Sequence, residues 1–135
     1  MILIVCVDDH NGMMFNHRRQ SQDRVLRADI LELTDGKKLW MNAYSRKQFA
    51  ESDAEKILVD ETFLDAAGDG EFCFVENADV SGCVERIGEI YLYRWNRDYP
   101  ADVYFPVDLS VWKCVETKEF AGSSHEKITR ERYTR

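Results

Sequence analysis

The run Ile-Leu-Ile-Val-Cys-Val at residues 2–7 is the feature that most constrains the fold of this chain. It is continuous, apolar and rich in β-branched residues, a pattern typical of a strand that is covered on both faces. Such a strand lies inside a sheet, so residues 2–7 predict a central strand. The stretch Asp-Asp-His-Asn-Gly after it predicts a turn, because Asn11 and Gly12 tolerate a positive φ angle.

Further along the chain, helices and strands alternate first and strands alone follow. A helix is expected from Ser21, whose side chain would cap free N–H groups, and Leu26, Ile30 and Leu33 give it one apolar stripe that stops near Gly36. The other expected elements are strands at 38–41, 56–60, 71–77 and 89–95, a second helix from Ser45 with Gln48 at capping-box spacing, and an antiparallel hairpin of 111–120 and 125–133. This order predicts an α/β fold, a mixed sheet with helices packed on it.

Length and charge limit the classes of protein. A chain of 135 residues with 44% apolar residues predicts a single domain, 1–135, with a packed core. The formal net charge of -7 repels phosphate backbones and anionic lipid, so neither nucleic acid nor a membrane surface is expected as a partner. Mixed-charge surfaces explain the basic stretches at 17–27 and 127–135.

The location of the protein is inferred from its N-terminus and its cysteines. The apolar run at 2–7 is too short to span a membrane and lacks the basic flank and cleavage site of a signal peptide, so a cytoplasmic protein is expected. The four cysteines (Cys6, Cys73, Cys83 and Cys114) lie far apart without a C-x-x-C motif, and we expect them to be reduced.

Several segments together resemble the dihydrofolate reductase family. LIVCVDDHNGM (3–13) is similar to that family's first strand and the start of its mobile loop, and SQDRVLRADIL (21–31) to its helix that begins Pro-x-Asp or Pro-x-Glu. LWMNAYSRKQF (39–49) stands in the place of Met-Gly-Arg-x-Thr-x-x-Ser. EIYLYRWNRDYPADVYFPVDLSVW (89–112) resembles Leu-Tyr-Leu-Thr, Gly-Asp-Thr-x-Phe-Pro and the tryptophan after them, and SSHEKITRERY (123–133) resembles the last strand.

The resemblance implies a mixed, mostly parallel central sheet with flanking helices and a C-terminal antiparallel hairpin. It also implies hydride transfer from NADPH to a dihydropterin. Asp23 falls at the family's single pocket carboxylate, which hydrogen-bonds the pterin ring and assists its protonation. The alternative is that Asp23 only stabilises the positive end of a helix dipole.

Other functional positions depart from the family. The apolar stretch that shapes the family's substrate pocket is replaced by HRRQSQ, in which Arg18 and Arg19 would bind an anionic ligand or lie solvated on the surface. The phosphate-gripping Gly-Arg is gone; Ser45 keeps a hydroxyl for a phosphate, or is a plain helix cap. Tyr93 replaces the pocket threonine and would partly fill the substrate space.

The cofactor motif departs further. The family has a strand that ends in Gly-Gly and is followed by a helix, which lets the backbone approach the cofactor pyrophosphate. Residues 72–95 contain only the lone glycines Gly82 and Gly88, so the pair and most of that helix are missing. No metal-ligand spacing and no G-x-S-x-G motif supports a metallo-nuclease or a hydrolase.

Three functions follow as hypotheses. The first is a dihydrofolate reductase-like protein without classical reductase activity, which binds a pterin-like small molecule or another protein. The second is a working NADPH-dependent reductase with Asp23 as the acid. The third is a subunit that self-associates through a sheet edge bared by the missing strand and helix.

Overall fold

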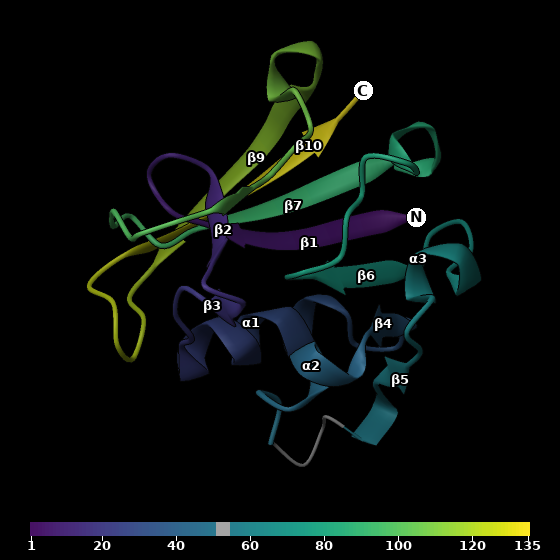
Figure 1. Ribbon diagram of the computed structural model, residues 1–135, viewed down its shortest axis with the longest axis horizontal. Coiled ribbons are helices and arrows are strands. Elements are labelled where there is room, and N and C mark those ends of the chain that lie inside the picture. Colours follow the sequence, from purple (N-terminus) through teal and green to yellow (C-terminus); the bar gives the residue numbers. More distant parts are fainter. Residues whose placement is uncertain (51–54) are drawn as a thin grey trace.

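The apolar run at the N-terminus forms β1 (Ile2–Val7) at the centre of a seven-stranded sheet (Figure 1). The computed structural model describes residues 1–50 and 55–135. The strand order is β5-β4-β6-β1-β7-β10-β9, and β5, β4, β6, β1 and β7 run parallel. Their bounds are Leu58–Val59 for β5, Leu39–Met41 for β4, Phe72–Val75 for β6 and Glu89–Arg94 for β7. The prediction of a central first strand is confirmed.

Both faces of the sheet are covered around β1, which explains why the β1 sequence is apolar at every position. On one face, Ile4 packs with Leu26 and Ile30 of α1 (Arg24–Leu33). On the other face, Leu3 and Val5 pack beneath α3 (Phe63–Ala66) and the loops around it. The remaining short helical segments are α2 (Ala43–Arg46), η2 (Val84–Arg86) and η3 (Leu109–Val111).

Two predicted helix starts were wrong. α1 begins at Arg24 and is capped by Asp23, not by Ser21, because the Asp23 carboxylate accepts the N–H groups of Val25 and Leu26. α2 is capped by Asn42, whose side chain accepts the N–H of Ser45. In each case the side chain of a neighbouring aspartate or asparagine, and not that of the serine, caps the helix.

A second, three-stranded sheet replaces the loop expected after the first strand. It consists of β3 (Arg18–Arg19), β2 (Gly12–Phe15) and β8 (Val103–Tyr104) in that order. Asn16 and His17 both have positive φ angles, 51° and 62°, and connect β2 to β3 as a two-residue hairpin turn of type I′. The beginning of the basic stretch, with Arg18 and Arg19, therefore lies in a tight hairpin.

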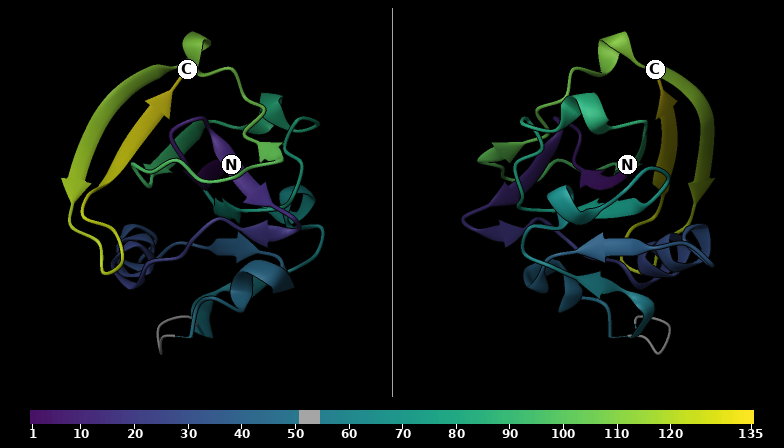
Figure 2. Two further views of the ribbon diagram at one scale, coloured as in Figure 1. Left: turned by 60° about the vertical axis from the view of Figure 1, so that its left-hand side comes forward. Right: turned by 90° about the vertical axis from the view of Figure 1, so that its right-hand side faces the viewer.

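The C-terminal hairpin consists of β9 (Lys113–Phe120) and β10 (Ile128–Thr134), and β10 pairs antiparallel with β7. Figure 2 shows that its connecting loop reaches the beginning of α1. All four cysteines are free thiols, as expected. In the described part of the chain, no helix has both the length and the apolar character needed to cross a membrane.

Candidate functional site

The candidate site is the crevice where β1, β6 and β7 end, which we call the central crevice. In open sheets of parallel strands, ligands bind outside the carboxyl ends of the strands. The cavity there measures only about 10 Å³. Its lining includes Cys6 and Val75 of the strands, Trp95 directly after β7, and Arg19, Gln20 and Ser21 from β3 and the segment after it. A cavity of this size holds about one water molecule. The chain itself fills the central crevice.

Asp23 lies beside the crevice with its side chain fully buried. Besides capping α1, it accepts hydrogen bonds from the N–H groups of Ser123 (3.0 Å) and Ser124 (2.8 Å) in the β9–β10 loop. Burial would raise the pKa of Asp23, but hydrogen bonds from Ser124, Ser123, His125 and Leu26 outweigh it and hold that pKa well below its usual range. Both oxygens of the carboxylate are therefore occupied by groups of the chain.

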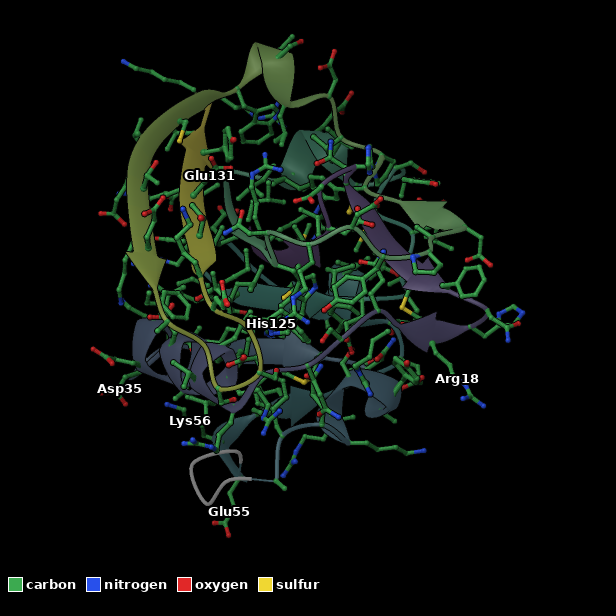
Figure 3. All side chains as sticks on the ribbon, turned by 90° about the vertical axis from the view of Figure 1, so that its left-hand side faces the viewer. Arg18, Asp35, Glu55, Lys56, His125 and Glu131 are labelled. Atoms are coloured by element: carbon green, nitrogen blue, oxygen red, sulfur yellow. The ribbon has the colours of Figure 1, made fainter. Side chains whose placement is uncertain are left out.

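His125 closes the same place from the β9–β10 loop (Figure 3). Its Nδ1 lies 3.1 Å from Oδ2 of Asp23, and its Nε2 faces the hydroxyls of Tyr99 at 2.9 Å and Ser21 at 3.2 Å. The imidazole stacks on Trp95 with 4.5 Å between ring centroids. Sequence reasoning missed His125, because no local pattern pairs two residues 102 positions apart.

Tyr93 is fully buried, and its hydroxyl donates to Oδ2 of Asp29 at 2.5 Å. Asp29 also accepts hydrogen bonds from Lys118 and Arg130, both at 2.8 Å. Tyr93 is thus hydrogen-bonded to Asp29, which lies more than one and a half helical turns after Asp23. Asp29 was missed although a signal existed: it lies on the apolar stripe of α1, three residues after Leu26.

Arg19 closes the crevice on the side of β6. Its guanidinium donates to both oxygens of Glu76, at 2.9 and 3.1 Å, and to the carbonyl oxygen of Tyr44 at 3.2 Å. It also lies 4.5 Å from the centroid of the Tyr44 ring. Arg19 therefore ties the β2–β3 hairpin to α2 and to the end of β6, while Arg18 lies outside the crevice on the exposed face of the hairpin.

The residues at the expected dinucleotide position do not fit a pyrophosphate. The N–H of Ala43, at the start of α2, donates to Oε2 of Glu61 at 2.8 Å, and Asn42 bonds to Asn77 at 2.8 Å. Ser45 is 1% exposed, and its hydroxyl has no hydrogen-bond partner among the described residues. A carboxylate thus already occupies the N–H of Ala43 at the start of α2, and the residues directly after β6 are Glu76 and Asn77 and not glycines that would admit a phosphate.

Asp8, directly after β1, is a further buried carboxylate, which the sequence placed only in a turn. It is 1% exposed. Its oxygens accept hydrogen bonds from the N–H groups of His10, Gly12 and Tyr99 and from the side chain of Gln20. Asp8 therefore fixes the loop after β1 against the segment after β7.

Comparisons with known proteins identify the fold. No protein-family model matches the sequence, and no curated protein is significantly similar to it. Among solved structures, a dihydrofolate reductase from Enterococcus faecalis, determined as a complex with NADP(H) and RAB-propyl, superimposes with a TM-score of 0.69. The match covers 99% of this chain and 95% of that one at 16% sequence identity. The chain therefore has a dihydrofolate reductase-like fold, with the mostly parallel sheet, flanking helices and antiparallel C-terminal hairpin that its sequence predicted.

Proposed function

We propose that this protein keeps the fold of a dihydrofolate reductase without the classical reductase activity, and that it is a small-ligand-binding domain. The filled central crevice is the observation that carries the proposal. A pterin needs a carboxylate with free oxygens, whereas those of Asp23 are occupied by Ser123, Ser124 and His125. A fold is shared by proteins of different function, so activity depends on the site and not on the fold.

The cofactor side supports the same proposal. Hydride transfer needs the dinucleotide and the substrate side by side in the crevice. At the end of β6, where the family's glycine pair would stand, Glu76 is paired with Arg19, and at the start of α2 the Glu61 carboxylate already accepts the N–H of Ala43. A reductase would have to break this pair and displace the β9–β10 loop before either molecule could enter.

Two alternatives remain distinguishable. The first is an NADPH-dependent reductase of a dihydropterin, which must bind the dinucleotide. The second is self-association through the edge strand β9, which is exposed along most of its length. β9 carries Lys113 and Lys118 and has an irregular register opposite Arg132 and Tyr133, and such features discourage pairing between edges. The geometry therefore favours a ligand-binding domain over a subunit.

A thermal-shift titration tests the proposal, because a ligand that binds only the folded state raises the melting temperature. The ligands are NADPH, methotrexate and trimethoprim; trimethoprim shares the diaminopyrimidine of methotrexate but has no carboxylate. We expect no saturable shift with NADPH or trimethoprim and elution as a monomer in size-exclusion chromatography. A saturable NADPH shift together with NADPH oxidation on dihydrofolate would overturn the proposal in favour of the reductase. A dimer that binds none of the ligands would favour self-association.

A further inference from the structure

A groove of about 330 Å³ lies along the β2–β3 hairpin, next to the central crevice, with which it shares Arg19 and Gln20. Its lining is completed by Phe15, Asn16 and Arg18 of the hairpin and by Tyr99 and Pro100 after β7. We call it the outer groove. We propose that this outer groove binds a small organic anion with a flat apolar body, of which an aromatic carboxylate is the simplest case. The proposal rests on the function proposed above and names the ligand class of that binding domain.

Arg18 supplies the charge that selects an anion. It is exposed, and within residues 1–50 and 55–135 its guanidinium forms no hydrogen bond or ion pair. Its neighbour Arg19 is paired with Glu76, and Arg94, Arg130 and Arg132 each contact a carboxylate as well. Figure 3 shows Arg18 at the periphery of the molecule with its side chain directed outward. A free guanidinium binds a carboxylate through two parallel hydrogen bonds.

Phe15 supplies the apolar surface next to that charge. Phe15 and Arg18 are direct partners across the β2–β3 hairpin, so their side chains lie on the same face. The Phe15 ring is 47% exposed, and the half-buried Tyr99 and the exposed Pro100 continue the apolar wall. An aromatic ring beside a free arginine matches a ligand with a flat ring and a carboxylate on its edge.

The walls of the groove are held in place before any ligand binds. The N–H of Tyr99 donates to Asp8 at 3.2 Å, and the side-chain amide of Gln20 donates to Asp8 at 3.1 Å and to the carbonyl of Pro100 at 3.3 Å. The turn of the hairpin is fixed by the N–H of Asn16, which donates to Asp102 at 3.0 Å. Walls that are already ordered lose less conformational entropy on binding, so a small ligand retains more of its interaction free energy.

A somewhat larger cavity elsewhere in the described structure has the opposite character. It measures about 370 Å³ and lies between α3 and η2, where it is lined by the acidic residues Glu61, Asp65 and Asp79. The guanidinium of Arg86 at its edge donates to the carbonyl oxygens of Leu64 and Ala67. An anion would be repelled there, so charge rather than volume distinguishes the two cavities. A volume of 330 Å³ is at the lower end of small-molecule sites, which suits one or two fused rings and not a dinucleotide.

The test is a titration of ¹⁵N-labelled protein with 2-naphthoate, followed by amide chemical shifts, with 2-naphthamide and 2-naphthylmethylammonium as ligands of similar shape but different charge. We expect saturable shifts at residues 15–20 and 99–100 with 2-naphthoate, and a Kd about tenfold higher for the amide, the loss of one charge-assisted contact. The cation should bind more weakly than the amide.

Two variants separate the groove from the rest of the surface. Arg18→Gln should raise the Kd for 2-naphthoate about tenfold, whereas Arg24→Gln, at an exposed arginine that starts α1, should leave it unchanged. Equal binding of all three ligands, an unchanged Kd in Arg18→Gln, or shifts confined to the acidic cavity would each overturn the proposal.

The same variants keep this result apart from the question of reductase activity. Methotrexate also carries aromatic rings and carboxylates, so its binding has to be assigned to one of the two sites. Methotrexate binding that is weakened by Arg18→Gln and not by Asp23→Asn belongs to the outer groove. NADPH binding with oxidation on dihydrofolate would contradict the proposed function and leave the result for 2-naphthoate standing. Conversely, a failure of 2-naphthoate would remove the ligand class but not the filled crevice.

Discussion

At the scale of single residues, Asp23 caps α1 and holds the β9–β10 loop with one carboxylate. The capping role has a local signal, because an aspartate just before an apolar stripe is a common helix start, although the prediction gave the cap to Ser21. The second role has no such signal, since Ser123, Ser124 and His125 lie about a hundred residues further along the chain. A sequence shows that a carboxylate stands at a helix start, but only the fold shows that its oxygens are already occupied.

Asp23→Asn separates these two roles. Asparagine caps helices as well as aspartate does, so α1 should keep its cap. The amide N–H₂ group would face the donors of Ser124 and His125, and we expect a loss of about 2 kcal/mol in the free energy of unfolding. Urea unfolding at pH 7 measures it, with Asp35→Asn as the control, because Asp35 is 86% exposed. Equal stability of the two variants would show that the contacts with the loop contribute nothing.

Gly122 allows the β9–β10 loop to approach Asp23 so closely. A Cβ atom at this position would overlap with the Asp23 carboxylate and with Cδ1 of Ile128. Gly122→Ala should therefore destabilise the protein by about 1–3 kcal/mol, the usual cost of overpacking. Gly82→Ala is the matched control, since a Cβ at Gly82 meets nothing within 4 Å. Similar melting temperatures for both variants would contradict the close packing of the loop.

At the scale of elements, the sequence predicted the strands of the main sheet better than anything else. Residues 2–7 and 89–95 are long apolar runs, and they became β1 and β7 with almost the same bounds. The three-stranded sheet was missed because two of its strands are only two residues long and have no periodicity to detect. The filled crevice could not be predicted, because it depends on contacts between the hairpin, the β9–β10 loop and the strand ends.

The turn of the β2–β3 hairpin gives a prediction at this scale. His17 has a φ angle of 62°, in the left-handed region that glycine adopts easily and β-branched residues avoid. His17→Gly should leave stability unchanged or raise it slightly, whereas His17→Val should lower it by about 1–2 kcal/mol. The two unfolding midpoints in urea should therefore differ clearly. If His17→Val were as stable as His17→Gly, the turn would not be of type I′.

At the scale of the whole molecule, three buried aspartates hold together segments that are far apart in the sequence. Asp8 joins the loops after β1 and β7, Asp23 joins α1 to the β9–β10 loop, and Asp29 joins α1 to β7, β9 and β10. Burial raises the pKa of each aspartate, but hydrogen bonds outweigh it, so all three pKa values lie below the usual range. Three carboxylates thus join the strand ends, α1 and the C-terminal hairpin through polar contacts.

These depressed pKa values make the folded protein sensitive to acid. A carboxylate whose pKa is lower in the folded state binds a proton more readily in the unfolded state. Its contribution to the free energy of unfolding is therefore complete above the unfolded pKa of about 3.9 and disappears as the pH falls below that value. Each lowered pKa therefore stabilises the folded state at neutral pH, and the contributions of the three carboxylates add. Partial neutralisation of the net charge of -7 acts in the opposite direction, but mostly through exposed charges, whose contributions are small. The midpoint of urea unfolding should therefore fall between about pH 5 and pH 2, most steeply below about pH 4, and it should fall less steeply in Asp23→Asn. A midpoint that stays constant over this range would mean that the three carboxylates are not stabilised in the folded state.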